Sequence, residues 1–296
     1  MWMAENIFPI FNGGHMNKVL FHSSMGDVSS RHIKSALQAV AADECDVLYI
    51  HTDMTFGLPV LKRGEVLGEL LEVIESLGVG TLVFPTFTFS FCNNEVFDVQ
   101  NSRTAMGALN EFARKSGRGV RSTDPLLSVY VMGDKLNLVD NLSEYSIGIG
   151  SNYDRLHLCG KEVRFLFFGA NMSECFTYTH YMEAAFKVPY RYDREFNGII
   201  VDEGKERSAR AFLYSSYANC RLNPNPLVHD AMQERGQLRK EALGDTTLCC
   251  FREHDAYETI SDLLTANPFC LTDGNFDASI RDTTYNPGGG RVVSVK

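Results

Sequence analysis

A histidine and a glutamate three residues apart form the clearest chemical signal in the sequence. His180 and Glu183 lie in the segment 174–183, ECFTYTHYME, which follows an apolar run that ends at Gly169. In a helix that begins near Thr177, this spacing places both side chains on one face. An imidazole beside a carboxylate that sets its tautomer is what general-base catalysis requires. The alternative interpretation is an ordinary helix histidine with a solvated neighbour.

The elements that must position this pair predict an α/β fold. The apolar run 162–168, EVRFLFF, predicts a buried strand, and open α/β folds bind ligands where such strands end. A strand at 46–50 (DVLYI), an amphipathic helix from about 64 to 77 and a strand at 81–84 (TLVF) form a β-α-β unit with parallel strands. We therefore expect a mixed, largely parallel central sheet flanked by helices.

The remaining segments give shorter signals. Ser29 or Ser30 is expected to cap a helix that carries Ile33, Leu37 and Val40 on one side. Further predictions are strands at 18–22 and 198–201, an apolar stretch at 129–132, a short helix after 102–112 and a helix at 256–264.

Residues 1–15 differ from the rest of the chain. They lack periodicity, and the GGH before Met16 resembles a cloning scar. We expect a leader that is either derived from cloning or disordered, followed by a single domain at 16–296.

Composition excludes several classes of protein. Of the 296 residues, 44% are hydrophobic and 22% charged, as in a soluble globular enzyme. No apolar run approaches the ~18 residues of a membrane span, and no signal peptide is visible, so we expect a cytoplasmic protein without membrane contacts. The net charge of −9 argues against binding nucleic acid. Eight scattered cysteines without a Cys-x-x-Cys pair predict reduced thiols and no metal site.

Short universal motifs give no function. No glycine-rich dinucleotide or phosphate loop joins a strand to a helix, and no Gly-x-Ser-x-Gly is present.

Five segments in a fixed order carry a family resemblance. They are His51-Thr52-Asp53-Met54 after the strand 46–50, GTLVFPTFT at 80–88, MGALNE at 106–111, RSTDPLLS at 121–128, and Thr177, His180 and Glu183 in Thr-x-x-His-x-x-Glu. In this order they resemble the aminoglycoside 3-N-acetyltransferase family of antibiotic and amino-sugar acetyltransferases. The resemblance covers about residues 45–198.

Three positions depart from the family pattern. Asp53 replaces the second serine of His-Ser-Ser, Asp124 replaces a histidine, and Glu174 stands where the family often has aspartate. If these positions shape the acceptor or cofactor pocket, the departures imply an acceptor other than an aminoglycoside drug.

The resemblance implies transfer of an acetyl group from acetyl-coenzyme A to a primary amine of an amino sugar or aminoglycoside. His180 is then the general base, and Glu183 orients it. The oxyanion would be stabilised by backbone N–H groups or by the hydroxyls of Thr86 or Thr88, which could equally do no more than end a strand.

The resemblance also suggests binding residues. His51, Thr52, Asp53, Arg121 and Ser122, together with the two threonines, are expected to bind acetyl-coenzyme A, although Arg121 alone would more often be a surface charge. The carboxylates of Glu174 and Glu111 are expected to hold the amines or hydroxyls of the acceptor. The partner is a small molecule, and the oligomeric state is open, with a homodimer as one option.

Two rival functions remain. One is a family member without catalysis that binds an amino sugar. The other is an acyl hydrolase in which Cys175 is the nucleophile and His180 its base, although a spacing of five residues separates the two side chains around a helix.

Overall fold

The computed structural model describes residues 17–135, 137–218, 220–222, 224–272, 275–281, 284–285 and 293–294. The predicted leader 1–15 lies outside these ranges.

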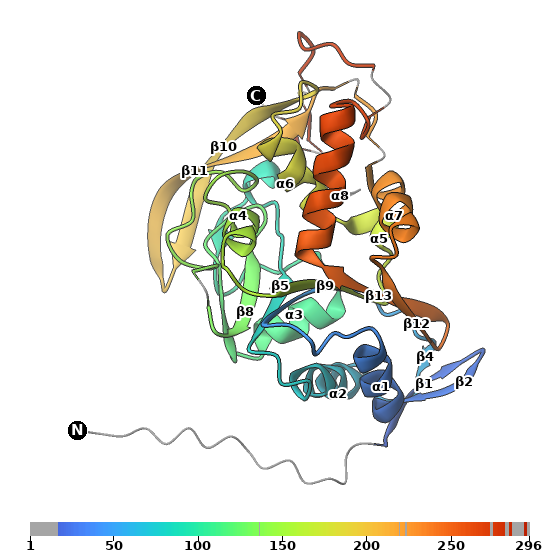
Figure 1. The fold of residues 1–296 in the computed structure, drawn as a ribbon. Helices are drawn as coiled ribbons and strands as arrows, with labels where there is room; N and C mark the ends of the chain where they lie inside the picture. Colours follow the sequence, from blue (N-terminus) through green and yellow to red (C-terminus); the bar gives the residue numbers. More distant parts are fainter. Residues whose placement is uncertain are drawn as a thin grey trace.

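A seven-stranded mixed sheet forms the centre of the fold (Figure 1). Three strands run parallel in its middle, in the order β9, β3 and β5, while β13 and β8 lie antiparallel on either side of them. In sheet order the strands are β12 (Arg239–Leu243), β13 (Thr246–Arg252), β9 (Val163–Phe168), β3 (Val47–Thr52), β5 (Thr81–Pro85), β8 (Val129–Gly133) and β7 (Gly119–Arg121). The predicted mixed sheet with a parallel core is confirmed.

Alternation along the central strands builds two hydrophobic cores. Leu48 and Ile50 of β3 face one core, whereas Val47 and Tyr49 face the other, as a period of two requires. The first core is covered by α1 (Ser30–Ala39), α2 (Arg63–Glu75) and α3 (Ala108–Lys115). The second is covered by α4 (Asn152–His157), α5 (Met172–Cys175), α6 (Tyr178–Ala185), α7 (Pro224–Glu234) and α8 (Glu253–Ala266). Helices therefore flank the sheet on both faces (Figure 1).

The predicted β-α-β unit is present, with small shifts in its boundaries. Helix α2 connects the parallel strands β3 and β5, and it buries Val66, Leu70 and Ile74. Ser29 caps α1, because its side chain accepts a hydrogen bond from the backbone N–H of His32. The predicted helices after 102–112 and at 256–264 correspond to α3 and α8.

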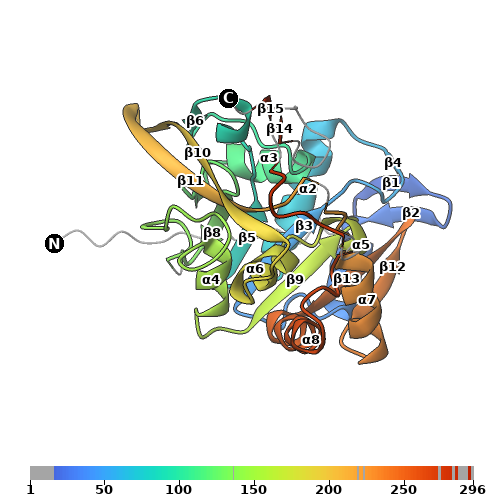
Figure 2. The same ribbon diagram turned by 90° about the horizontal axis from the view of Figure 1, so that it is seen from above.

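A long hairpin extends well beyond the predicted strand 198–201. Its strands β10 (Arg191–Asp202) and β11 (Lys205–Ser216) pair along their whole length, and β6 (Phe97–Asp98) adds a short parallel strand. The hairpin projects from the body of the protein in Figure 2. Its extent was missed because exposed polar side chains alternate with buried ones along β10, so no continuous apolar run marks the strand.

Smaller elements complete the described structure. These are the sheet of β2 (Gly26–Ser29), β1 (Val19–Ser23) and β4 (Leu58–Pro59), the pair β14 (Thr284–Tyr285) and β15 (Val293–Ser294), and the 3-10 helix η1 (Phe91–Asn93). Within the described ranges, no helix combines the length and the apolar character needed to cross a bilayer.

Candidate active site

The turn after β9 leads into α5 and α6 at the edge of the central sheet. Gly169 adopts a positive φ of 76°, and a Cβ there would lie 2.3 Å from the backbone oxygen of Asp53. The chain then forms the short helix α5, whose start is capped by the side chain of Asn171. Helix α6 begins at Tyr178, one residue after the start expected from the sequence.

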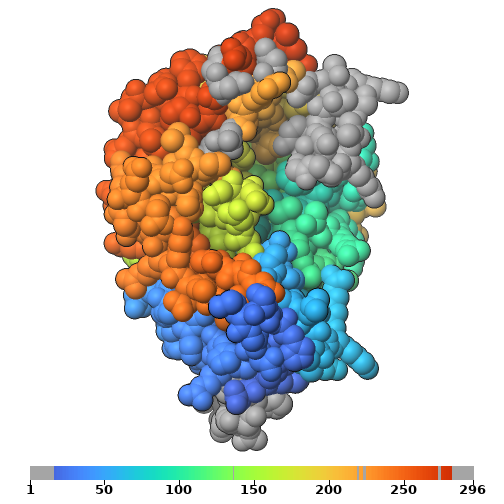
Figure 3. Space-filling model, turned by 90° about the vertical axis from the view of Figure 1, so that its right-hand side faces the viewer, coloured from blue at the N-terminus to red at the C-terminus, as the bar shows by residue number. Residues whose placement is uncertain are grey.

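A cleft of about 1290 Å³ lies at this edge of the sheet. It is bounded by the carboxyl ends of β3 and β5, the start of α3, the segment around α5 and the base of the β10–β11 hairpin. Figure 3 shows a hollow between the yellow-green segment around α5 and the teal segment that leads into α3. Of the predicted site residues, five line the cleft: His51, Thr52, Asp53, Thr88 and His180.

His180 and Glu183 form the predicted pair on one face of α6. Their Nδ1 and Oε2 atoms are 2.7 Å apart. The His180 side chain is 35% exposed and lines the cleft, whereas that of Glu183 is 0% exposed and lies behind it. The pair therefore has the order that general-base catalysis needs, with the imidazole toward the cavity and the carboxylate beneath it.

Two residues from the start of the hairpin complete the cluster. Arg191 Nη2 lies 2.9 Å from Glu183 Oε2 and 2.9 Å from His180 Nδ1. The hydroxyl of Tyr190 donates a hydrogen bond of 2.9 Å to Glu183 Oε1. Both oxygens of the buried carboxylate thus have partners, which offsets the cost of burying its charge.

The charges of this cluster favour one tautomer of His180. Burial acts to raise the pKa of Glu183, but Arg191 and the hydrogen bonds from His180 and Tyr190 outweigh it and hold that pKa below its usual value. Nδ1 of His180 lies 2.7 Å from the ionised carboxylate, which needs a donor, and 2.9 Å from Arg191 Nη2, which can itself donate to Glu183 Oε2 at 2.9 Å. We assign the ring proton to Nδ1 because the carboxylate oxygen is the nearer partner. Nε2 then carries a free lone pair.

The same surroundings keep His180 neutral. Desolvation of the ring and the positive charge of Arg191 lower the pKa of His180, and they outweigh the opposite effect of Glu183. The imidazole is consequently unprotonated near neutral pH and ready to accept a proton at Nε2.

The residues at the end of β3 take different positions. The His51 ring is buried, stacks on Phe167 at 4.6 Å between ring centroids, and has a pKa lowered by burial to about 3. Thr52 donates a 2.8 Å hydrogen bond to the side chain of Asn110. Asp53 is exposed and accepts a hydrogen bond from the backbone of Met54. His51 is therefore a neutral wall residue, whereas Asp53 supplies negative charge.

Arg121 and Ser122 do not reach the cleft, contrary to their predicted role with coenzyme A. All three guanidinium nitrogens of Arg121 donate to protein oxygens, among them the backbone oxygens of Thr86 and Ser102. Ser122 is fully buried and pairs with the backbone of Val129. Burial and these bonds leave neither residue directed toward a phosphate.

The two threonines have hydroxyls that are already engaged. Thr86 is fully buried and donates to the backbone oxygen of Ser128. Thr88 lines the cleft, but its hydroxyl donates a 2.8 Å hydrogen bond to the backbone oxygen of Pro125. Neither hydroxyl proton is available for an oxyanion in this arrangement.

The two carboxylates predicted to hold the acceptor lie outside the cleft lining. Glu111 forms a bidentate pair with Arg114 and also contacts Lys115. Glu174 is exposed and accepts a hydrogen bond from the side chain of Asn171. The ion pairs with Arg114 and Lys115 therefore explain the position of Glu111, and the Glu174 carboxylate is bound by Asn171 outside the cleft lining.

Cys175 lines the cleft but is not paired with the imidazole. Its thiol donates to the backbone oxygen of Asn171, and desolvation of the sulfur together with the negative charges of Glu174 and Asp53 raises its pKa, although the residue as a whole is exposed. A cysteine nucleophile needs an adjacent base that generates thiolate. His180 instead contacts Glu183 and Arg191, so the geometry disfavours the hydrolase.

Sequence reasoning missed Tyr190, Arg191 and Asn110 as site residues. The first two lie seven and eight positions beyond Glu183 and reach it only because the chain turns back into β10. Asn110, on α3, bridges Thr52 and the backbone oxygen of Pro85. The MGALNE segment was the available signal for Asn110, because it contains that residue.

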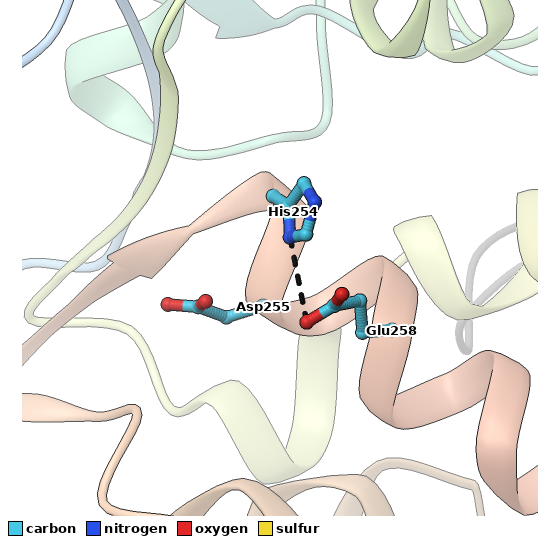
Figure 4. Close-up of side chains that lie close together, drawn as sticks. All are labelled: His254, Asp255 and Glu258. Carbon is cyan, nitrogen blue, oxygen red and sulfur yellow. Dashed lines mark ion pairs between the residues drawn. The ribbon is translucent and has the colours of Figure 1, made fainter.

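A separate group of side chains on α8 has the composition of a metal site. Donor atoms of His254, Asp255 and Glu258 lie within 4.8 Å of one another (Figure 4). His254 and Glu258 are exposed and form an ion pair of 3.5 Å, whereas Asp255 points away from that pair in the figure. A helical i, i+4 pair explains this arrangement without a metal ion.

Comparison with known proteins identifies the family. A model of the family described as aminoglycoside 3-N-acetyltransferase matches residues 50–265. The chain belongs to this family. Its members transfer acetyl groups, so this protein is an acetyltransferase by family. No curated protein sequence matches the chain.

Solved structures share the fold of this acetyltransferase at low identity. The apoenzyme of aminoglycoside acetyltransferase AAC(3)-IVa is 17% identical, with coverage of 88% of this chain and 93% of its own, and a TM-score of 0.66. AAC-IIIb, solved with CoASH, is 15% identical, with coverage of 80% of this chain and 96% of its own, and a TM-score of 0.69. YokD from Bacillus subtilis is 16% identical, with coverage of 85% of this chain and 96% of its own, and a TM-score of 0.68.

Proposed function

We propose that this protein transfers an acetyl group from acetyl-coenzyme A to a primary amine of an amino sugar or aminoglycoside. The observation that carries the proposal is the cluster of His180, Glu183 and Arg191 at the wall of a large cleft. The acyl donor fits the family and the structural neighbour AAC-IIIb, which binds CoASH.

His180 performs the proton transfer in this mechanism. A sugar amine attacks the thioester carbonyl, a C–N bond forms, and Nε2 of His180 takes the proton that the nitrogen loses. The C–S bond then breaks and the thiolate of coenzyme A leaves. Glu183 stabilises the imidazolium formed on the way, since its ionised carboxylate already faces Nδ1.

Arg191 and Tyr190 act through Glu183. Arg191 keeps the carboxylate ionised, and its charge opposes protonation of His180 in the resting enzyme. The base is therefore free before the amine arrives. The buried position of Glu183 strengthens these electrostatic effects, because little water screens them.

The start of α3 is the best candidate for the site that binds the phosphate groups of coenzyme A. Gly107, the N-cap, lines the cleft at a φ of 101°, and a Cβ there would lie 3.2 Å from Thr52. Helix N-termini bind phosphate through their backbone N–H groups. Arg103, exposed at the same side of the cleft, adds a positive charge. We therefore assign phosphate binding to these groups and no longer to Arg121 and Ser122.

Backbone N–H groups are the favoured donors for the oxyanion. The hydroxyls of Thr86 and Thr88 already donate to backbone oxygens. A fixed N–H dipole costs no reorganisation during the reaction.

We also propose that residues 16–296 act as one acetyltransferase domain in the cytoplasm. The support is the family match across residues 50–265 and the presence of eight free thiols.

A thiol-release assay with acetyl-coenzyme A and a panel of amino sugars tests the proposal. We expect release that depends on the acceptor and is lost in His180→Ala. His254→Ala is the matched control, because His254 also pairs with a glutamate on a helix but lies outside the cleft lining. Binding of amino sugars without any release would instead establish the non-catalytic alternative.

A further inference from the structure

One wall of the cleft is a loop that belongs to no helix or strand. Each residue from 102 to 107 borders the cavity, and the last of them, Gly107, is the N-cap of α3. We call residues 102–107 the cleft loop; they lie in the segment that leads into α3 (Figure 3). Because a loop lacks the regular hydrogen bonds of helices and strands, other contacts must fix its backbone if it is to hold a ligand in one place.

Glu111 fixes the middle of the cleft loop from α3. Its Oε2 atom accepts a 3.2 Å hydrogen bond from the backbone N–H of Thr104 and a 2.9 Å hydrogen bond from Nε of Arg114. Arg114 also donates to the backbone oxygen of Gln100, two residues before the loop. Burial acts to raise the pKa of Glu111, but the hydrogen bonds from Arg114 and Thr104 outweigh it and hold that pKa at about 2. The carboxylate is therefore ionised near neutral pH and remains an acceptor for the loop.

Arg121 fixes the start of the cleft loop from β7. Its Nη1 atom donates to the backbone oxygen of Ser102 at 2.6 Å, and its Nη2 atom to that of Thr86 at 2.6 Å. Thr86 directly follows β5, so one guanidinium group joins the loop to the end of a central strand. The planar fork of arginine can bind two such oxygens at once, whereas lysine carries a single ammonium group.

Arg103 lies between these two points of attachment. Arg121 holds the backbone oxygen of the preceding residue. Glu111 holds the backbone N–H of the following one. Arg103 itself is exposed and lines the cleft, and no described residue pairs with its guanidinium group. The chain is thus fixed on both sides of a cation that is free to bind an anion.

We propose that Glu111 and Arg121 are positioning residues that hold Arg103 beside the start of α3, where Arg103 binds a phosphate group of coenzyme A. The inference rests on the proposed assignment of the phosphate groups to the start of α3, and it adds how that site is kept in place. Glu111 and Arg121 lie outside the cleft lining and do not touch the ligand. They act because a backbone that is already fixed loses less conformational freedom when the phosphate binds.

Calorimetry on the full chain tests the binding role of Arg103 without turnover. We expect Arg103→Ala to weaken coenzyme A binding about tenfold, because the variant removes a charge-assisted hydrogen bond to phosphate. Pantetheine, which lacks the phosphate groups, is the second probe, and its affinity should stay unchanged. An unchanged affinity for coenzyme A would overturn the inference.

Two further variants test the positioning role. Glu111→Ala removes the acceptor for the loop, and Arg121→Lys keeps the charge but loses the fork. We expect each to weaken coenzyme A binding several-fold and to leave pantetheine binding unchanged. They act from different elements, so one remains informative if the other fails to fold. Glu75→Ala is the matched control, because Glu75 also pairs with an arginine, Arg118, but lies outside the cleft lining.

A double-mutant cycle separates positioning from a general structural effect. If Glu111 and Arg121 act through Arg103, their replacement should have no further effect on coenzyme A binding in the Arg103→Ala background. Effects that persist in full in that background would overturn the inference, as would a parallel loss of pantetheine binding. Coenzyme A binding with the expected pattern, but without acetyl transfer to any amino sugar, would defeat the proposed function and leave the inference intact.

Discussion

Helix α6 and the start of strand β10 contribute to one cluster in different ways. His180 and Glu183 are neighbours on α6, so their contact follows from helical spacing alone. Arg191 reaches them from β10, after the chain has turned back. In the proposed mechanism the local pair supplies the acid–base chemistry, whereas the charge of Arg191 lowers the pKa of both members.

Loss of the base itself should have the largest effect. We expect His180→Ala to lower kcat by ~10²- to 10⁴-fold with little change in coenzyme A binding, because the variant removes proton transfer only. Steady-state kinetics and calorimetry check this. If coenzyme A binding fell as much as kcat, the contribution of α6 would be structural instead.

Removing the carboxylate should affect stability next. Glu183→Gln keeps the shape but leaves Arg191 buried without its counter-charge, and breaking a buried pair costs roughly 3–5 kcal/mol in the free energy of unfolding. The pKa of His180 should fall further, because the group that raises it is lost. Urea unfolding measures the first effect, and a stability loss below about 1 kcal/mol would contradict the importance of the pair.

The same residue predicts a pH dependence. The folded-state pKa of Glu183 lies below its ordinary value of 4.5, so its stabilising contribution is present above pH 4.5 and is lost as the pH falls through the folded-state pKa. We expect Glu183→Gln to remove that part of the acid destabilisation. Identical slopes of unfolding free energy against pH in both proteins would argue against it.

The contribution of the hairpin is tested by Arg191→Gln. Its positive charge lowers the pKa of His180, so its removal should raise that pKa. The acid limb of kcat/KM, which reports protonation of the free base, should move to higher pH. A limb that stays in place or moves to lower pH would show that the hairpin does not control the base.

Tyr190→Phe should have the smallest effect. It removes one hydrogen bond to an ionised oxygen of Glu183 and leaves Arg191 in place. We expect a loss of about 1.5 kcal/mol in unfolding free energy and little change in the pH profile. A large shift of the acid limb would mean that Tyr190, rather than Arg191, is the main control.

The same contrast explains how much could be predicted from the sequence. The strands β3, β5 and β9 are continuous apolar runs, and α2 has a clear helical period, so the parallel core was visible. The spacing of His180 and Glu183 likewise predicted a contact inside one helix.

Contacts between distant elements could not be predicted in this way. Arg121 has the character of a phosphate-binding residue in the sequence, but the fold buries it among backbone oxygens. Arg191 looks like one charge among several in VPYRYDRE, and only the fold places it against Glu183. Burial and partnership of charged groups are tertiary properties, which a local pattern does not contain.

Nitrogen-15 NMR of the His180 ring tests the central claim most directly, with His180→Gln used to assign its signals. We expect a neutral imidazole near pH 7 whose proton is on Nδ1 and whose pKa is below the ordinary value of 6.5. A proton on Nε2 would mean that no lone pair faces the cleft in the resting enzyme and would contradict the proposed base. A pKa above 6.5 would contradict the control of His180 by burial and Arg191.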